Sequence, residues 1–339
     1  MSAVRFLQLE PTTRCNFTCG FCAGRHMPQS DLSLDTLRAA LDALPDVEHV
    51  ELQGEGEPLI HPAFFDLLAE IRGRGIRVSF ICNGSLLSPR NVDRLLDLGV
   101  EKISVSLESP DPEQFRALRG GLFDKVVRGV ETLLAARGAR GLDRPTVGLS
   151  VTVLRSTIDA LPEIIALYRR LGLDGGVTLQ PLQAKEDYAA HYGEAMRAHM
   201  LTPRQSDAVW VRMLTHPDLR AIERARAPVR GFFDDLMDGW QPASGRCPWL
   251  EAGLYVERDG TAQVCCMSKD PDRALGHVGP GTVDAVIAAR DAMRDELARG
   301  RIPAPCAGCD IARFATISRL ELMWWGIRGV AARLGIAPA

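Results

Sequence analysis

Residues 15–22 read Cys-Asn-Phe-Thr-Cys-Gly-Phe-Cys, so three cysteines follow one another with three and then two residues between them. Thiolates at Cys15, Cys19 and Cys22 can hold three corners of a [4Fe–4S] cube and leave the fourth iron without a protein ligand. An open coordination position is where a catalytic metal site takes its substrate, whereas a structural site is closed. A zinc knuckle and three incidental cysteines are the other interpretations of this spacing. The rest of the chain favours the [4Fe–4S] cluster over these two interpretations.

The first half of the chain alternates short β-rich runs with amphipathic helical patterns. Ser33 and Ser88 are expected to cap two of the helices, because serine accepts hydrogen bonds from the first free backbone N–H groups. Strands are predicted at 4–9, 49–53, 77–82, 102–108, 147–154 and 177–180. Six β–α alternations of this length imply a parallel sheet with right-handed crossovers. The alternation alone leaves a partial barrel and an open doubly wound sheet both possible.

Short polar motifs follow the second, third and fourth predicted strands. They are Gly56-Glu57-Pro58, Asn83-Gly84 and Ser106-Leu107-Glu108. The two-residue period of a strand puts positions 106 and 108 on one face, so both can meet one ligand. Taken singly, each motif is also explained by a tight turn or by ordinary strand-end chemistry. Taken in order, each motif follows its own strand, where the active sites of barrel enzymes gather.

The cysteine spacing and these motifs together resemble the radical S-adenosylmethionine (SAM) enzymes. The resemblance implies an α/β fold with a partial (β/α)6 TIM-like barrel and a small C-terminal α+β Fe–S extension. It implies a [4Fe–4S] cluster on Cys15, Cys19 and Cys22, with SAM chelating the open iron through its amino and carboxylate groups. In this family the cluster splits SAM into methionine and a 5′-deoxyadenosyl radical, which abstracts a hydrogen atom from the substrate.

The resemblance also assigns SAM-binding roles along the chain. Gly56 and Glu57 match the element that binds the methionine amino group, and Ser106 and Glu108 match the one that contacts ribose and carboxylate. Glu55 stands where many members carry a second glycine. The whole expected SAM-binding set is Phe21, Gly56, Glu57, Asn83, Ser106, Glu108, Ser150 and Gln180. Phe21 is expected beside the adenine, and Ser150 and Gln180 are placed by position only.

A second group of cysteines lies far from the first: Cys247, Cys265, Cys266, Cys306 and Cys309. Asp259-Gly260 predicts a hairpin turn between strands at 254–257 and 261–265. The group resembles the SPASM or twitch extension of many radical SAM enzymes, which carries auxiliary Fe–S clusters. Five cysteines are too few for two clusters, so we expect one auxiliary [4Fe–4S] cluster, assigned to Cys247, Cys265, Cys306 and Cys309. A four-thiolate structural zinc site is the alternative.

Neighbouring residues of a strand point to opposite faces, so only one of Cys265 and Cys266 is expected to bind the cluster, and the sequence leaves open which. The cysteine of this pair that does not bind the cluster, which is Cys266 in the assignment above, is a candidate hydrogen-atom donor to a substrate radical. Cys82 at the end of the third strand is a second candidate. The alternative for both is simple packing, because free cysteine behaves as a small hydrophobic residue. Oxidation, cross-linking and epimerisation of the substrate all stay open.

The substrate is expected to be a peptide of a natural-product pathway, with a small molecule such as a sugar or alcohol as the alternative. Tyr188, His191 and Tyr192 are candidates to line a substrate channel, and Trp324-Trp325 is expected to pack onto its own domain. A flavodoxin or ferredoxin would supply electrons. A non-catalytic zinc-binding interaction protein is the alternative from another class, and it leaves the strand-end motifs without a role.

Composition limits the remaining possibilities. The 339 residues are 46% hydrophobic and 24% charged, with a net charge of −3, so neither a nucleic-acid partner nor a membrane span is expected. Nine cysteines and no recognisable signal peptide indicate metal or redox use in the cytoplasm rather than disulfides. The expected division is a barrel at 1–184, a helical linker or cover at 185–243, and an auxiliary-cluster domain at 244–339.

Overall fold

The computed structural model describes residues 2–182, 184–226, 243–318 and 321. Its centre is a sheet in the order β6-β5-β4-β3-β2-β1-β7-β8-β9. The strands are β1 Phe6–Leu9, β2 His49–Leu52, β3 Arg77–Cys82, β4 Lys102–Ser106, β5 Thr146–Val153, β6 Val177–Pro181, β7 Gly253–Val256, β8 Thr261–Gln263 and β9 Gly276–His277. The first six pair in parallel in chain order, which confirms the α/β partial barrel.

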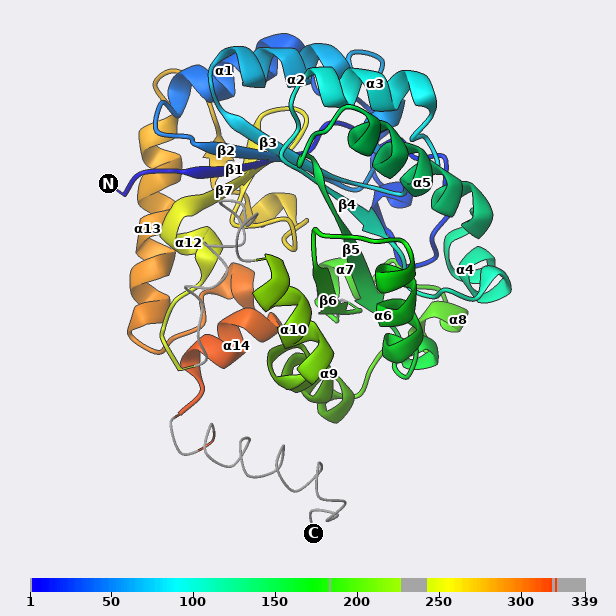
Figure 1. Ribbon diagram of the computed structural model, residues 1–339. Helices are drawn as coiled ribbons and strands as arrows, with labels where there is room; N and C mark the ends of the chain where they lie inside the picture. The colour runs from blue at the N-terminus through cyan, green and yellow to red at the C-terminus, as the bar shows by residue number, and fades with distance from the viewer. Residues whose placement is uncertain (1, 183, 227–242, 319–320, 322–339) are drawn as a thin grey trace.

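Helices lie around the outside of the curved sheet (Figure 1). The α-helices are α1 Leu34–Ala43, α2 Phe64–Gly73, α3 Pro89–Asp97, α4 Pro112–Arg119, α5 Phe123–Ala139, α6 Leu161–Arg170, α7 Glu186–Ala189, α8 Glu194–Arg197, α9 Pro203–Thr215, α10 Pro217–Arg226, α12 Pro248–Ala252, α13 Val283–Ala298 and α14 Asp310–Thr316. Short 3-10 turns are η1 Ala23–His26, η2 Pro58–Ile60, η3 Arg155–Thr157, η5 Pro271–Arg273 and η6 Ala304–Cys306. Ser33 and Ser88 cap α1 and α3 as expected.

The C-terminal hairpin belongs to the same sheet as the barrel strands. Strand β7 pairs in parallel with β1, and β8 and β9 continue the sheet in antiparallel pairing. Gly260 makes the β7–β8 turn with φ +93°, a left-handed conformation that glycine adopts without strain. The predicted auxiliary region is therefore built directly onto the edge of the barrel. The division of the chain at residues 184 and 243 stays a prediction.

The two faces of the sheet differ in polarity. Side chains that face the helices are apolar and form one core, as Leu7, Val50 and Val78 do. The alternate set on the first strands also contains Phe6 but is mainly polar, and Gln8 and Glu51 are direct neighbours in the ladder. Bulky branched residues fill the interior of an ordinary barrel of this type. A polar interior marks the inside of this barrel as the place for a polar ligand.

Two features of the helices were not predicted from the sequence. Helix α4 went unpredicted, although Asp111 caps its start and Gly120 ends it in the left-handed region with φ +68°. The region expected to be a helical linker or cover begins with two short helices, α7 and α8, and Gly193 lies between them, because glycine is a poor residue inside a helix. The Trp324-Trp325 pair lies outside the described residues.

Candidate functional site

The cysteine loop leaves β1 and passes directly over the Gly56 turn that follows β2. A Cβ atom at Gly56 would lie 2.3 Å from the carbonyl oxygen of Thr12 and 2.6 Å from that of Arg14. The next backbone N–H, of Glu57, donates to the Arg14 carbonyl at 2.8 Å. Glycine is therefore required here so that the two backbones can touch, and this contact fixes the loop against the end of β2.

Glu57 connects the ends of the second and third strands. Its carboxylate accepts hydrogen bonds from the backbone N–H of Asn83 at 2.7 Å and of Leu59 at 3.2 Å. The Asn83 side chain in turn donates to Asn16 of the cysteine loop at 2.8 Å. Burial raises the pKa of Glu57 to about 7, against the two N–H donors that favour its charged form. The structure thus brings Glu57, Asn83 and the cysteine loop together.

Glu108 is paired with Arg119, a residue that sequence reasoning missed. The Arg119 guanidinium donates to both carboxylate oxygens of Glu108, with Nη2 to Oε1 at 2.7 Å, and Glu108 is fully buried. Arg119 Nη1 also lies 3.9 Å from the sulfur of Cys19. Burial raises the pKa of Cys19 to about 11, and the Arg119 charge acts in the opposite direction. The buried ion pair therefore presents a cation to a predicted cluster ligand.

The backbone at the end of α4 supports the same loop. Thr18 N–H donates to the Arg119 carbonyl at 2.9 Å, and Gly20 N–H donates to that of Leu118 at 3.3 Å. A Cβ atom at Gly121 would lie 2.2 Å from the Phe17 ring, so this glycine admits the loop closely. The Asp-Pro start and Gly-Gly end of α4 were the available sequence signals for this support.

The remaining predicted SAM-binding residues fall into two places. Ser106 and Ser150 pair directly across β4 and β5. Phe21 lies 5.7 Å from the Arg119 guanidinium, measured to its ring centroid. Gln180 on β6 instead donates to the Met267 sulfur at 3.4 Å, next to the second cysteine group. Gln180 thus contacts the C-terminal loop, whereas Ser106, Ser150 and Phe21 lie near the other motifs.

Glu55 holds the cysteine loop and the C-terminal loop together. Its carboxylate accepts from the Tyr188 hydroxyl at 2.5 Å, lies 3.4 Å from the Lys269 ammonium, and lies 3.4 Å from the Cys22 sulfur. Burial alone would raise the pKa of Glu55, but Lys269 and Tyr188 together lower it below its usual value. The structure therefore explains the glutamate at position 55, because its carboxylate connects the two loops. The sequence showed only that many family members carry glycine here and did not indicate this role.

The segment with α7 and α8 covers the cysteine loop. Tyr188 and Tyr192 are buried in an apolar cluster with Ala23, while exposed His191 stacks on His26 with ring centroids 4.9 Å apart. The Tyr188 hydroxyl also donates to the Cys266 carbonyl at 3.1 Å. These contacts place the predicted channel residues over the first cysteine group. Whether they line a substrate channel stays a prediction.

Four of the C-terminal cysteines gather in one small apolar cluster with Leu250, Val264 and Leu297. They come from three separate segments: Cys247 precedes α12, Cys265 follows β8, and Cys306 and Cys309 flank a turn before α14. The members of the set are Cys247, Cys265, Cys306 and Cys309. Burial, together with the charges of the neighbouring thiols, raises the pKa of Cys265 to about 11 and that of Cys306 to about 12.

Cys266 and Cys82 lie in other surroundings. Cys266 is buried outside that apolar cluster, and the charges that act on its thiol are those of its neighbour Cys265 and of Lys269, Glu51 and Glu55. Cys82 lies on the same face of β3 as Val78 and Phe80, and this face packs against the helices. Cys266 therefore belongs with the barrel-side network, and the placement of Cys82 favours the packing alternative over a hydrogen-donor role.

The donor chemistry of both cysteine sets fits Fe–S clusters, which proteins bind through thiolates. In the first set, burial is the largest cause that raises the pKa of Cys19 and of Cys22, and the charge of the preceding cysteine adds to it in each case. All nine cysteines are free of disulfides. Within the described ranges, no group of three or more His, Cys, Asp or Glu side chains is already arranged to hold a metal ion.

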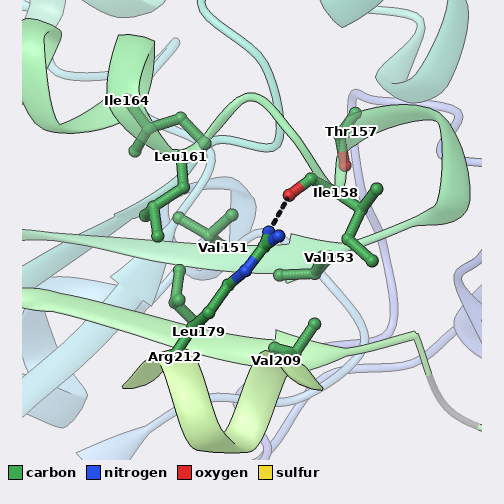
Figure 2. Close-up of a pocket in the computed structure, with 9 residues that line it drawn as sticks. All are labelled: Val151, Val153, Thr157, Ile158, Leu161, Ile164, Leu179, Val209 and Arg212. Carbon is green, nitrogen blue, oxygen red and sulfur yellow. Dashed lines mark hydrogen bonds between the residues drawn. The ribbon is translucent and has the colours of Figure 1, made fainter. Parts of the chain in front are cut away.

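An apolar pocket lies away from these sites, between strands β5 and β6 and helices α6 and α9 (Figure 2). Arg212 reaches across it and donates to the Ile158 carbonyl at 2.8 Å. Its lining residues are Val151, Val153, Thr157, Ile158, Leu161, Ile164, Leu179, Val209 and Arg212. None of the predicted ligands lines this pocket, and its valines belong to the core on the helix side of the sheet.

The fold and site define a partial-barrel α/β protein with a polar, cysteine-bearing mouth. Residues 9–175 match the family model described as the radical SAM superfamily. The chain therefore belongs to this superfamily through that domain, whose cofactors are SAM and a [4Fe–4S] cluster. Among the described residues, no helix has the length and apolar character needed to cross a membrane.

Curated relatives match about half of the chain. It is 29% identical over 177 residues to the tungsten-containing aldehyde ferredoxin oxidoreductase cofactor-modifying protein of Pyrococcus furiosus, covering 50% of each chain. It is 37% identical over 185 residues to a GTP 3′,8-cyclase of Rhizobium leguminosarum, covering 51% of this chain and 50% of the relative. The chain thus spans about half the length of the curated relatives it matches.

Solved structures match the fold over most of the chain. Streptococcus suis SuiB bound to S-adenosylmethionine superposes with a TM-score of 0.63 and 14% identity, covering 95% of this chain and 75% of SuiB. The anSMEcpe structure with bound AdoMet and the Cp18Cys peptide gives a TM-score of 0.65 and 16% identity, covering 93% and 88%. The shared fold includes the region of the second cysteine group, since so much of the chain is covered.

Proposed function

We propose that this chain is a radical SAM enzyme that uses one auxiliary [4Fe–4S] cluster to complete the reaction of a substrate radical. The observation that carries the proposal is the gathering of Cys247, Cys265, Cys306 and Cys309 in a single apolar cluster, apart from the first cysteine loop. Cys266 lies outside that cluster, so Cys265 is the fourth ligand in this proposal. The alternatives are a structural zinc ion on the same four thiolates and a non-catalytic zinc-binding protein.

When bound, the first cluster and SAM supply a 5′-deoxyadenosyl radical. The chain's own residues prepare the place for it. Glu57 and Asn83 tie the ends of two strands to the cysteine loop, and the Arg119 cation offsets negative charge beside Cys19. The polar side chains of Ser106 and Ser150 face the same ligand space in this proposal. Each of these groups sits on a strand end or an adjoining turn, which holds it in place.

A peptide is the proposed substrate, with oxidation or cross-linking as its reaction. SuiB, which shares the fold over 96% of this chain, has been solved with its precursor peptide SuiA, and anSMEcpe with the Cp18Cys peptide. The small-molecule alternative has its own support, because the relatives matched at higher identity include GTP 3′,8-cyclases. Cys266 beside the barrel network would serve an epimerase as hydrogen donor. A flavodoxin or ferredoxin donor and a cytoplasmic location stay predictions.

The first test is the iron and acid-labile sulfide content after anaerobic reconstitution. We expect about eight irons per chain for the wild type and about four for the Cys15→Ala/Cys19→Ala/Cys22→Ala variant, because each [4Fe–4S] cluster holds four. Zinc retained in both proteins, with iron falling from about four to near zero, would refute the auxiliary cluster and leave the radical SAM assignment intact. Absence of 5′-deoxyadenosine after anaerobic reduction with SAM would refute the enzyme itself.

The ligand assignment is tested by a matched pair. Cys265→Ala is expected to lose about four irons per chain, whereas Cys266→Ala keeps about eight. The two residues are neighbours in sequence, so the comparison controls for local damage to the hairpin. The reverse result would make Cys266 the ligand and would remove it as a hydrogen donor.

A further inference from the structure

The hydroxyl of Tyr192 is buried without a hydrogen-bond partner. Only 4% of the residue is exposed, and its hydroxyl oxygen contacts no donor or acceptor among the residues that the structure describes. The backbone around it is held in place, because its N–H donates to the Ala189 carbonyl at 3.2 Å and its carbonyl accepts from Arg197 Nε at 2.9 Å. Buried polar groups in folded proteins are nearly always hydrogen-bonded, so an exception indicates a group that binds there.

This hydroxyl lies beside the part of the first loop that carries Cys22. Tyr192 packs in one apolar cluster with Ala23, the residue that follows Cys22 in the chain. Burial raises the pKa of the Tyr192 hydroxyl, and the negative charges of Glu55 and Cys22 raise it further. The packing and the electrostatics therefore agree that the hydroxyl faces Glu55 and Cys22.

The carboxylate of Glu55 is already occupied by other partners. One oxygen accepts from the Tyr188 hydroxyl at 2.5 Å and lies 3.4 Å from the Lys269 ammonium. The other accepts from the Gly24 N–H at 3.3 Å and from the Cys22 thiol at 3.4 Å. A carboxylate offers about four acceptor sites, and these contacts use them all. The acceptor that remains beside the unpaired hydroxyl is the sulfur at Cys22.

Cluster binding changes the hydrogen-bonding character of that sulfur. In the metal-free chain the Cys22 thiol is itself a donor, to the backbone carbonyl and the carboxylate of Glu55. A cysteine loses this proton when it binds a metal, and the sulfurs of an Fe–S cluster accept hydrogen bonds. We propose that Tyr192 donates a hydrogen bond to a sulfur of the first [4Fe–4S] cluster, at or next to Cys22. The inference rests on the part of the proposed function that assigns this first cluster, and it does not need the auxiliary one.

A hydrogen bond of this kind would raise the reduction potential of the first cluster. Reduction adds negative charge to the cluster sulfurs, so a donor stabilises the reduced form more than the oxidised form. Hydrogen bonds to the sulfurs are among the properties that set the potential of an Fe–S cluster. The Glu55 carboxylate beside Cys22 acts in the opposite direction. Tyr192 therefore makes the cluster easier to reduce.

The test compares Tyr192→Phe with the wild type and with Tyr168→Phe as the matched control. Each variant removes one buried tyrosine hydroxyl, and that of Tyr168 accepts from the N–H of Gly176, which precedes β6. The full-length proteins are reconstituted anaerobically and their iron is counted. Electron paramagnetic resonance identifies the first cluster by the signal that is absent from the variant without the three cysteines of the first loop. A redox titration of this signal gives the midpoint potential.

We expect Tyr192→Phe to keep its iron and to have a more negative midpoint potential. At the potential where half of the wild-type first cluster is reduced, its ratio of reduced to oxidised cluster should fall at least threefold, which is a shift of about 28 mV for one electron. Electron–nuclear double resonance of the wild type should show a proton coupling that disappears in deuterated water and is missing from Tyr192→Phe. Tyr168→Phe should match the wild type in both measurements.

Four results would overturn the inference in distinguishable ways. An unchanged potential with unchanged proton couplings in Tyr192→Phe means that the hydroxyl contacts no sulfur. An equal shift in Tyr168→Phe assigns the change to the loss of any buried hydroxyl. Weaker SAM binding by Tyr192→Phe in anaerobic calorimetry, with the potential of the SAM-free cluster unchanged, assigns the hydroxyl to SAM instead. Absence of the first cluster from the wild type refutes the proposed function, and the inference about Tyr192 fails with it.

Discussion

The two cysteine groups are built from the same ligand type in opposite surroundings. In the first, Cys15 is exposed, and the loop is held by backbone carbonyls, Asn83 and the Glu108–Arg119 pair. In the second, each of the four cysteines is at least partly buried among leucine, valine and alanine side chains. A site that must admit a ligand keeps one side open and polar, whereas a site that only holds its metal is closed.

This difference separates the energetic roles of the two groups. Charged residues around the first loop are buried and paired, so breaking any pair should affect both stability and the loop. The second group is stabilised mainly by apolar contacts. Changes near the first loop should therefore leave iron on the C-terminal cysteines. The predictions below test that independence.

Arg119→Met should have the largest effect on stability. It leaves the Glu108 carboxylate buried without its cation, and breaking a buried ion pair from one side costs about 3–5 kcal/mol. We also expect loss of the first cluster, because the Arg119 backbone and side chain both contact the loop. Urea unfolding of the metal-free protein and iron counting of the reconstituted protein measure the two effects.

Arg140→Met is the matched control for that variant. Arg140 pairs with Asp93 and Asp97 on the surface, where an ion pair contributes about 0–1 kcal/mol. The control should keep about eight irons per chain. Equal destabilisation of the two variants, or loss of only the C-terminal iron from Arg119→Met, would contradict the proposed division between the sites.

Glu57 should make the stability of the chain depend on pH. Its folded-state pKa of about 7 lies above the ordinary value of 4.5, so the folded state binds this proton more tightly than the unfolded state. The resulting stabilisation is fully present below pH 4.5 and is lost as the pH rises through 7. Relative to Glu57→Gln, which does not titrate there, the free energy of unfolding of the wild type should fall by about 3 kcal/mol across this interval.

Urea unfolding of the metal-free wild type and Glu57→Gln at several pH values between 4 and 8 measures this difference. Glu70→Gln is a suitable control, since Glu70 lies on the helix surface and its arginine neighbours lower its pKa. A flat difference between wild type and Glu57→Gln would show that folding leaves the pKa of Glu57 unchanged, because its two backbone donors then offset the effect of burial.

Gly56→Ala should destabilise the chain by about 1–3 kcal/mol, because the added methyl group meets two backbone carbonyls that must move. Gly73→Ala, at the last residue of α2 with nothing within 4 Å of the added carbon, should be neutral or stabilise by up to about 1 kcal/mol. Thermal melts of the metal-free proteins compare them. A normal melt for Gly56→Ala would mean that the loop shifts freely, against the tight contact described here.

The sequence predicted the barrel well because local patterns determine it. The strand at 77–82 and the caps at Ser33 and Ser88 follow from two-residue alternation and serine capping, which depend on near neighbours only. The approach of Glu57 and Asn83 followed from topology, since the ends of parallel strands meet at one edge. These predictions needed no knowledge of individual contacts.

Contacts between distant segments could not be predicted from the sequence. Arg119 meets Cys19 across 100 positions of the chain, and Lys185 meets Pro305 across 120. A lone arginine or lysine in a helical stretch is normally solvated, so neither residue was distinguishable by type or spacing. The choice between Cys265 and Cys266 likewise depends on which face of the hairpin packs against α12 and α13, and alternation alone gives no sign of that.

The last comparison concerns the two tyrosines that cover the first loop. Tyr188→Phe removes hydrogen bonds to Glu55 and to the Cys266 carbonyl and should cost about 1–3 kcal/mol. The Tyr192 hydroxyl is buried and has no hydrogen-bond partner within the described part of the chain, so Tyr192→Phe should be neutral or stabilise by up to about 1 kcal/mol in the metal-free protein. Urea unfolding of both variants measures the difference. Equal destabilisation would mean that the Tyr192 hydroxyl makes a hydrogen bond in solution. The segment with α7 and α8 would then be held over the loop by both tyrosines, not by Tyr188 alone.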